Sequence, residues 1–170
     1  MGSPTAGEII EYLGLSPHPE EGGWFLETHR ADESLAREIL PGRYTGPRTM
    51  GTAIYYLLTP DTYSHMHRLI SDETFHFYAG GPCEMLQLHP DGSGETIVFG
   101  NDVLAGQRPQ IVVPRGSWQG LRLLPGADFA LMGCTVAPGF EYADYAHGER
   151  AVLVARYPEF RDWIVRLTAR

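Results

Sequence analysis

Residues 63–81 read Tyr63-Ser-His-Met-His-Arg-Leu-Ile-Ser-Asp-Glu-Thr-Phe-His-Phe-Tyr-Ala-Gly-Gly81. Two short runs that contain Tyr, Phe and Thr lie on either side of a short polar break. Runs of this length and composition, bounded by turn residues, are typical of β-strands. The stretch therefore predicts two strands, 63–69 and 73–78, separated by a short turn.

The same pattern extends outward in both directions. Short runs rich in Ile, Val, Tyr, Phe and Thr are separated by Pro, Gly, Asp or Asn, with strong turn signals at residues 89–94 and 124–128. An earlier strand is expected at 24–30, followed by a surface loop at 31–48 with a helical turn near Leu35. The sequence predicts eight further strands at 50–58, 63–69, 73–78, 83–89, 96–99, 110–113, 118–124 and 129–136.

Helices are expected only at the two ends. Thr5 and Glu8 have the spacing of a capping box, and Gly14 offers a left-handed stop. Near the C-terminus, Pro158 suits a first helical turn, and an apolar stripe follows at Phe160, Trp163, Ile164 and Leu167. Many strands with edges to cover favour a jelly-roll barrel. The expected fold is all-β: one domain over 1–170, with a barrel core at about 24–140, a short N-terminal helix and C-terminal helices at about 148–168.

Charge and composition limit the class of partner. The chain has 13 Lys and Arg against 21 Asp and Glu, a formal net charge of −8. An acidic chain without a basic run lacks the charge that binds phosphate backbones, so nucleic acid polymers and anionic membranes are not expected partners. No targeting or membrane-spanning segment is evident, and the expected location is the cytoplasm. Cys83 and Cys134 are expected to be buried, reduced thiols.

The densest group of chemically active residues lies in the opening stretch. His65 and His67 are two residues apart, so in a regular strand both imidazoles face the same side. Glu73 opens the next strand and can fold back beside them. Two histidines and a carboxylate are a common ligand set for iron, manganese, nickel or zinc. The alternative for His65 is a hydrogen-bonded histidine lining or rimming the barrel.

These residues also carry a family resemblance. His65-x-His67, then Glu73, then Gly80 resembles the first cupin motif, and Pro114-Arg-Gly116-Ser-Trp-Gln119 resembles the second. Further strings narrow the match to the cupin-5 family, a domain of unknown function: Glu21-Gly-Gly-Trp-Phe-Leu-Glu, Ala53-Ile-Tyr-Tyr-Leu-Leu, Asp72-Glu-Thr-Phe-His-Phe-Tyr, Gln110-Ile-Val-Val-Pro and Cys134-Thr-Val-Ala-Pro-Gly-Phe. The resemblance implies a cupin jelly roll and a homodimer. It implies no particular reaction.

The second motif departs from the family pattern at the position of its metal ligand. Gln119 stands where that motif has a histidine, and an amide oxygen is a weaker ligand than imidazole. We therefore expect no cofactor, or a weakly bound divalent metal at His65, His67 and Glu73. His67 and Glu73 are the candidate catalytic residues. The candidate ligand-binding residues are His65, His76, Gln119, Trp118, Tyr55, Tyr78, Arg48 and Arg68.

Several of these candidates have open alternatives. Strict alternation from Glu73 places His76 outside the barrel, and a bulge after the turn would bring it inside. The aromatic candidates can pack in the core or at an interface instead of against a ligand.

The expected ligand is a small polar metabolite bound inside the barrel, with a nucleotide or nucleotide sugar as the first class to try. Paired imidazole and carboxyl groups favour acid–base chemistry of the isomerase or epimerase type. The alternatives are a non-catalytic binding module and a metal-dependent cupin enzyme. The sequence does not decide whether the protein is an enzyme.

Overall fold

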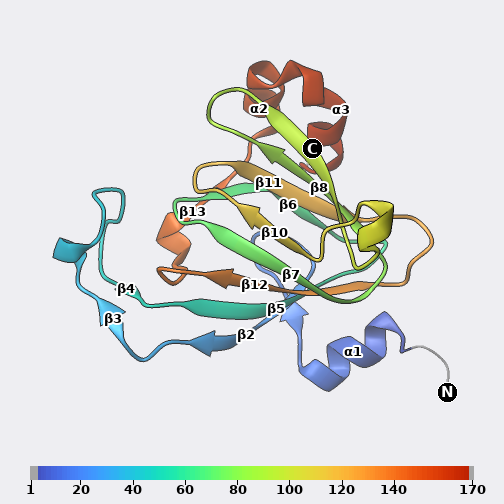
Figure 1. Ribbon diagram of the computed structural model, residues 1–170, viewed down its shortest axis with the longest axis horizontal. Helices are drawn as coiled ribbons and strands as arrows, with labels where there is room; N and C mark the ends of the chain where they lie inside the picture. The colour runs from blue at the N-terminus through green and yellow to red at the C-terminus, as the bar shows by residue number, and fades with distance from the viewer. Residues whose placement is uncertain (1–3, 169–170) are drawn as a thin grey trace.

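The computed structural model describes residues 4–168, which form two antiparallel β-sheets packed face to face (Figure 1). One sheet has six strands in the order β1 (Ser16–Pro17), β2 (Trp24–Arg30), β5 (Thr52–Leu58), β12 (Ala130–Val136), β7 (Glu73–Gly80) and β10 (Gln110–Val113). The other has five strands in the order β13 (Tyr145–His147), β6 (Tyr63–Leu69), β11 (Trp118–Leu123), β8 (Cys83–Leu88) and β9 (Gly94–Phe99).

The strand order defines a jelly roll. Along the chain from β5 to β8, successive strands alternate between the two sheets. The later strands also alternate: β10 pairs with β7, β11 lies between β6 and β8, and β12 lies between β5 and β7. Each of these later strands pairs with strands that come earlier in the sequence, so the two sheets enclose one interior. The predicted jelly-roll fold is confirmed, and the predicted strands 24–30, 63–69 and 110–113 match β2, β6 and β10 at both ends.

Apolar side chains from both sheets fill most of the interior. This core includes Tyr56, Phe75, Phe99, Leu121 and Met132, none of which is more than 2% exposed. It is built from β5 and from the strands between β7 and β12.

Helices cover the outer faces of the two sheets (Figure 1). α1 (Ala6–Leu13) has the predicted capping box between Thr5 and Glu8 and ends at Gly14, whose φ is 68°. It packs against Leu57 of β5. α2 (Arg150–Arg156) and α3 (Arg161–Arg166) pack on the other sheet. The predicted apolar stripe at 160–167 packs in the same cluster as Met66. The helical segment predicted to begin at Pro158 starts as a 3-10 helix, Pro158–Phe160, before α3.

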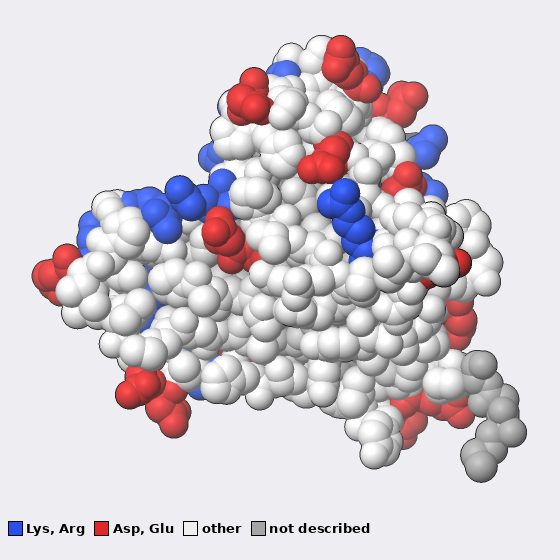
Figure 2. Space-filling view, in the orientation of Figure 1, with Lys and Arg blue, Asp and Glu red and all other residues white. Residues whose placement is uncertain are grey.

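The loop at 31–48 is more ordered than the sequence indicates. It contains a two-stranded sheet of β3 (Ser34–Leu35) and β4 (Arg48–Thr49), and its helical turn is a 3-10 helix at Arg37–Ile39. Two further 3-10 turns lie at Val103–Ala105 and Tyr142–Asp144. Within residues 4–168 no helix is long and apolar enough to span a membrane. Acidic side chains are scattered over the face in Figure 2 rather than gathered in one patch.

Candidate functional site

A tight turn before β2 places Glu21 inside the barrel. The turn uses Gly22 and Gly23, whose φ angles of 83° and 70° favour glycine. A Cβ atom on Gly22 would lie 2.6 Å from the carbonyl oxygen of Tyr63, so only glycine fits against β6. The Tyr56 hydroxyl donates to the Gly22 carbonyl oxygen (2.7 Å), and the His65 amide donates to the Glu21 carbonyl oxygen (2.8 Å). These contacts hold the Glu21 side chain in the interior.

A β-bulge in β6 separates the two motif histidines. Gln119 of β11 pairs with His67, whereas Leu121 pairs with Ser64. A step of two residues along β11 therefore matches a step of three residues along β6, so β6 has one extra residue at this point. The extra residue breaks the alternation, and Ser64 and His67 are both buried. The His65 ring instead lies beside Tyr63 and His147, with centroid distances of 4.5 and 5.7 Å. The prediction that His65 and His67 point the same way is wrong because β6 is not a regular strand.

His67 presents a free imidazole nitrogen to Glu21. Its Nδ1 lies 2.7 Å from the His65 carbonyl oxygen, which only accepts, so Nδ1 carries the proton and Nε2 has the lone pair. Nε2 has no hydrogen-bond partner and lies 3.6 Å from Glu21 Oε1. Burial lowers the pKa of His67, so its ring is neutral at pH 7.

His18 approaches the same carboxyl group in the opposite tautomer. Its Nδ1 accepts from the amides of Glu20 (3.3 Å) and Glu21 (2.9 Å), so Nε2 carries the proton. That nitrogen lies 3.8 Å from Glu21 Oε1. Burial, followed by His67, lowers the pKa of His18 to about 4. Glu21 therefore lies between one nitrogen that can donate and one that can accept.

The Glu21 carboxyl group favours its protonated form in this position. Burial raises its pKa to about 8, and both neighbouring imidazoles are neutral. A neutral carboxylic acid can donate its proton, whereas a carboxylate can only accept. At pH 7 the Glu21 carboxyl group is therefore mainly protonated.

Glu73, the first residue of β7, supplies a second buried carboxyl group. It is 7% exposed, and the Gln119 amide donates to its Oε2 at 2.5 Å. Burial and the nearby Glu21 raise the pKa of Glu73 to about 7, against the opposing effects of His67 and Gln119. Protonated and ionised forms are therefore about equally populated at neutral pH. Gln119 pairs with His67 and donates to Glu73, so these three residues are neighbours in the interior, but of the three only Glu73 lines the cavity described next.

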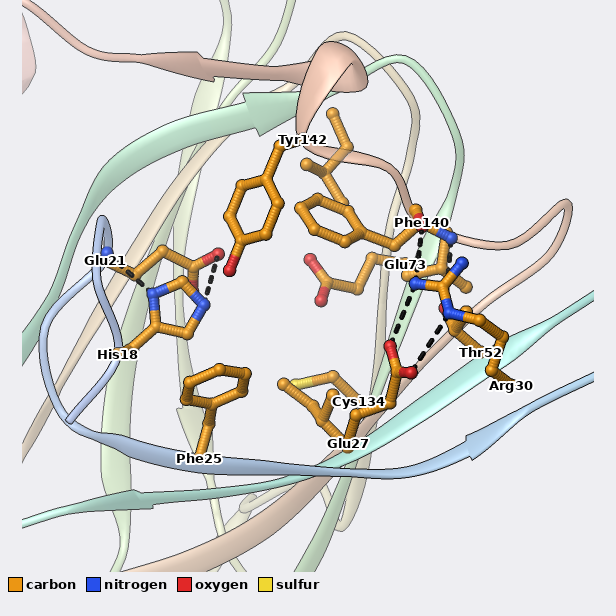
Figure 3. A pocket seen from close by; sticks show the side chains of 13 residues that line it. His18, Glu21, Phe25, Glu27, Arg30, Thr52, Glu73, Cys134, Phe140 and Tyr142 are labelled. Atoms are coloured by element: carbon orange, nitrogen blue, oxygen red, sulfur yellow. Dashed lines mark hydrogen bonds and ion pairs between the residues drawn. The ribbon is translucent and has the colours of Figure 1, made fainter. Parts of the chain in front are cut away.

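Both carboxyl groups face one cavity of about 210 Å³ (Figure 3). Its remaining walls are largely apolar. Figure 3 shows the rings of Phe25, Phe140 and Tyr142 around the space into which Glu21 and Glu73 point. The lining residues are His18, Glu21, Phe25, Glu27, Arg30, Thr52, Ile54, Leu69, Glu73, Cys134, Val136, Phe140 and Tyr142.

One arginine lies at the edge of this cavity. Arg30 contacts Glu27 and Glu141, each at 2.9 Å, and also donates to the Phe140 carbonyl oxygen at 3.1 Å. Its side chain is 38% exposed, so it lies at the mouth rather than the floor. Its charge is balanced by two carboxylates.

The three residues expected to bind a metal do not converge on one point. Among residues 4–168 no group of three or more His, Cys, Asp or Glu side chains is arranged to hold one. His65 is turned away by the bulge, and the Gln119 amide group donates to Glu73. The arrangement of His65, His67 and Glu73 expected from the motif is thus not formed.

Several predicted ligand-binding residues lie on the outer face of the six-stranded sheet. His76 contacts Thr135 Oγ1 through Nε2 (3.0 Å), as strict alternation from Glu73 indicates, and no bulge brings it inside. Tyr55 and Tyr78 pack edge to face at a centroid distance of 6.1 Å. None of these three side chains lines the cavity.

The other predicted candidates have structural contacts elsewhere. Trp118 packs in the cluster beneath the C-terminal helices, and the Arg68 guanidinium lies 4.6 Å from its ring centroid. Arg48 is buried, and its Nε donates to Asp144 Oδ2 at 2.7 Å. It also donates to the carbonyl oxygens of Gly46 and Pro47. The Arg48 guanidinium is therefore already paired, and neither arginine lines the cavity.

The sequence analysis missed the residues that the N-terminal segment contributes. Glu21, His18 and Arg30 line the cavity together with Tyr142. One signal was present, because a carboxylate followed by two glycines indicates a sharp turn that can direct a side chain inward. That string was used for the family resemblance alone.

The fold and the site together define a class: a jelly-roll barrel with an interior cavity that two carboxyl groups face. The chain belongs to the family described as Cupin superfamily (DUF985), which matches residues 7–148. It is 33% identical over 147 residues to the uncharacterized protein YML079W of Saccharomyces cerevisiae, covering 81% of this chain and 72% of the yeast protein.

Solved structures agree with this assignment. A hypothetical protein from Leishmania major superposes with a TM-score of 0.87 at 30% identity, over 98% of this chain and 100% of that one. Protein SO0799 from Shewanella oneidensis gives 0.85 at 32% identity, over 98% and 99%. Oxalate decarboxylase of Bacillus subtilis gives 0.54 at 13% identity, over 92% of this chain and 37% of the enzyme, which is a likeness of fold alone.

Proposed function

We propose that the barrel binds one small polar metabolite and transfers a proton to or from it, as isomerases and epimerases do. The observation that carries this proposal is the pair of buried carboxyl groups, Glu21 and Glu73, that face one cavity with pKa values of about 8 and about 7. General acids and bases work best when their pKa lies near the working pH. Two titratable groups with separated pKa values can also take different roles.

The geometry supports a role for each group. Glu21 is the candidate acid, because it is mainly protonated at pH 7. His67 Nε2, 3.6 Å behind it, is positioned to exchange a proton with it and acts as a positioning residue. Glu73 is the candidate base, and Gln119 fixes its orientation through the hydrogen bond to Oε2. The proposed catalytic pair is thus Glu21 and Glu73. His67 contacts Glu21 from outside the cavity lining.

The cavity volume limits the ligand. At about 210 Å³ the cavity is smaller than the roughly 300–1,000 Å³ typical of pockets for drug-sized ligands. A nucleotide or nucleotide sugar would have to leave its phosphates outside, where Arg30 is already paired with Glu27 and Glu141. We therefore propose a smaller metabolite as the first ligand class and a nucleotide as the second.

A ligand screen followed by an exchange assay tests the proposal. Thermal shift against a panel of small metabolites, with nucleoside diphosphates included, would identify compounds that stabilise the protein. Each hit would then be incubated with the protein in D₂O and followed by proton NMR. The proposed function predicts that a carbon-bound proton of the ligand exchanges for deuterium, since an abstracted proton is replaced from solvent.

Matched variants assign the exchange to the cavity. Glu73→Gln keeps the side-chain shape and removes the base, so exchange should fall by about 10²-fold or more. Glu38→Gln changes an exposed glutamate outside the cavity and should exchange at the wild-type rate. Binding without exchange would favour the non-catalytic binding module. A panel with no stabilising compound would contradict both functions.

A further inference from the structure

The cavity has a strongly uneven distribution of polarity. Glu21 and Glu73 provide its buried carboxyl groups, whereas Phe25, Ile54 and Phe140 supply apolar surface around them (Figure 3). A polyol has hydroxyl groups on every side, and those facing the apolar walls would be left without partners, at roughly 1–3 kcal/mol each. The walls therefore fit a ligand with one polar end and an apolar body.

The two carboxyl groups become acceptors when they ionise. Glu73 is about half ionised at pH 7, and Glu21, which is mainly protonated at that pH, accepts once it loses its proton. His67 Nε2, behind Glu21 and outside the cavity lining, is an unpartnered acceptor, whereas His18 Nε2 carries a proton and can donate. A ligand that brings hydrogen-bond donors and a positive charge favours the ionised carboxyl groups and matches them.

The lining contains no uncompensated cation. Arg30 is the lining residue with a permanent positive charge, and Glu27 and Glu141 both pair with it. His18 is neutral above pH 5, because burial lowers its pKa to about 4. An anionic ligand would thus meet two carboxyl groups and no free positive charge, which disfavours it strongly in a buried site.

We infer that the ligand of this cavity is a small primary amine, bound as its ammonium ion between Glu21 and Glu73, with an apolar body against Phe25, Ile54 and Phe140. The inference rests on the proposed function and names the chemical class of its ligand. An ammonium group offers three donors and one positive charge to the two carboxyl groups. The aromatic rings add an attraction between the cation and their faces.

Ammonium binding should release protons from the protein. A cation between Glu21 and Glu73 favours the ionised form of both carboxyl groups and so lowers their pKa from about 8 and about 7. At pH 7 these values correspond to about 0.9 and about 0.5 bound protons, so complete ionisation releases up to about 1.4 protons. The other titratable or charged groups around the two carboxyls are His18, His67, Cys134, Tyr142, Tyr145 and the Arg30 pairs with Glu27 and Glu141.

Three ligands of matched shape test the inference: n-butylammonium, 1-butanol and butyrate. Isothermal titration calorimetry at pH 7, in two buffers of different ionisation enthalpy, gives the Kd and the number of protons released. We expect n-butylammonium to bind at least tenfold more tightly than 1-butanol, with release of about 0.5 to 1.4 protons. Butyrate should give no binding heat.

Variants connect the result to the cavity. Glu21→Gln and Glu73→Gln should each weaken n-butylammonium binding by at least tenfold and reduce the proton release, whereas Glu38→Gln should change neither. Circular dichroism would verify that each variant is folded. Because each carboxyl group is tested separately, one variant that fails to fold leaves the other as the test.

Other outcomes separate the inference from the proposed function. Equal or tighter binding of 1-butanol, binding of butyrate, or no binding of n-butylammonium would overturn the assignment to an amine. The proposed proton transfer would still stand if another metabolite from the panel showed exchange in D₂O. Exchange that is absent for every bound compound would overturn the proposed function, whatever the charge of the ligand.

Discussion

The stability of the protein should fall as the pH rises from about 6.5 to about 8.5, because Glu21 and Glu73 must ionise inside the barrel. Burial raises their pKa values from 4.5 to about 8 and about 7. Between pH 4.5 and these values the folded state binds more protons than the unfolded state does. The stability gained from protonation is complete below pH 4.5 and is lost as the pH passes through about 7 and about 8.

The size of the effect follows from the two pKa values. Over this pH range, linkage gives a loss of about 2 kcal/mol from Glu21 and about 1 kcal/mol from Glu73. His18, His65 and His67 oppose part of this loss, because their pKa values are lowered from 6.5 and the unfolded state still binds protons at these sites near pH 6.5. Each opposes it by up to about 0.4 kcal/mol. The net loss of about 1.5–2.5 kcal/mol corresponds to a decrease in Tm of roughly 3–10 °C for a domain of this size.

Urea unfolding followed by tryptophan fluorescence at several pH values would measure the loss. Glu21→Gln should remove about 2 kcal/mol of the pH dependence, because an amide does not titrate in this range. Glu38→Gln, at an exposed position, should retain the full wild-type dependence. A free energy of unfolding that stays flat or rises between pH 6.5 and 8.5 would refute the reasoning, as would an unchanged slope in Glu21→Gln.

Three further predictions concern the scaffold. Gly22→Ala should destabilise the protein by about 2–3 kcal/mol, since the φ of Gly22 is 83° and the new Cβ would lie 2.6 Å from the Tyr63 carbonyl oxygen. Gly42→Ala is the control: there is open space around Gly42, so the same urea titration should show no loss of stability. Asp144→Ala should cost about 3–5 kcal/mol, because it leaves the Arg48 guanidinium buried without its carboxylate, and thermal unfolding would show a correspondingly lower Tm. We also expect a homodimer, so light scattering should give about twice the chain mass of 18.9 kDa, and a monomer mass at micromolar concentration would contradict this.

Local sequence patterns were sufficient to place most of the secondary structure. Tyr63–Leu69 and Gln110–Val113 are short runs that contain β-forming residues, and turn residues bound each of them. The capping box at Thr5 and Glu8 likewise depends on contacts three residues apart. Such features are fixed by the chemistry of neighbouring residues, so a single sequence reveals them.

Part of the site was predictable for the same reason. His67 and Glu73 lie on consecutive strands joined by a short turn, and Gln119 occupies the matching position of the second motif. The structure brings these three side chains together. The orientation of His65 was not predictable, because the bulge in β6 depends on how that strand pairs with β11.

The sequence by itself determined the strands, the turns and the jelly-roll class, because these depend on periodicity and on backbone preferences of nearby residues. Only the tertiary structure decided the site. Glu21 enters the barrel through a glycine turn packed against β6, and it meets Glu73 from a strand more than 50 residues later. Their raised pKa values arise from burial and, for Glu73, also from the nearby Glu21. Burial is a property of the folded assembly of strands, and local sequence does not specify it.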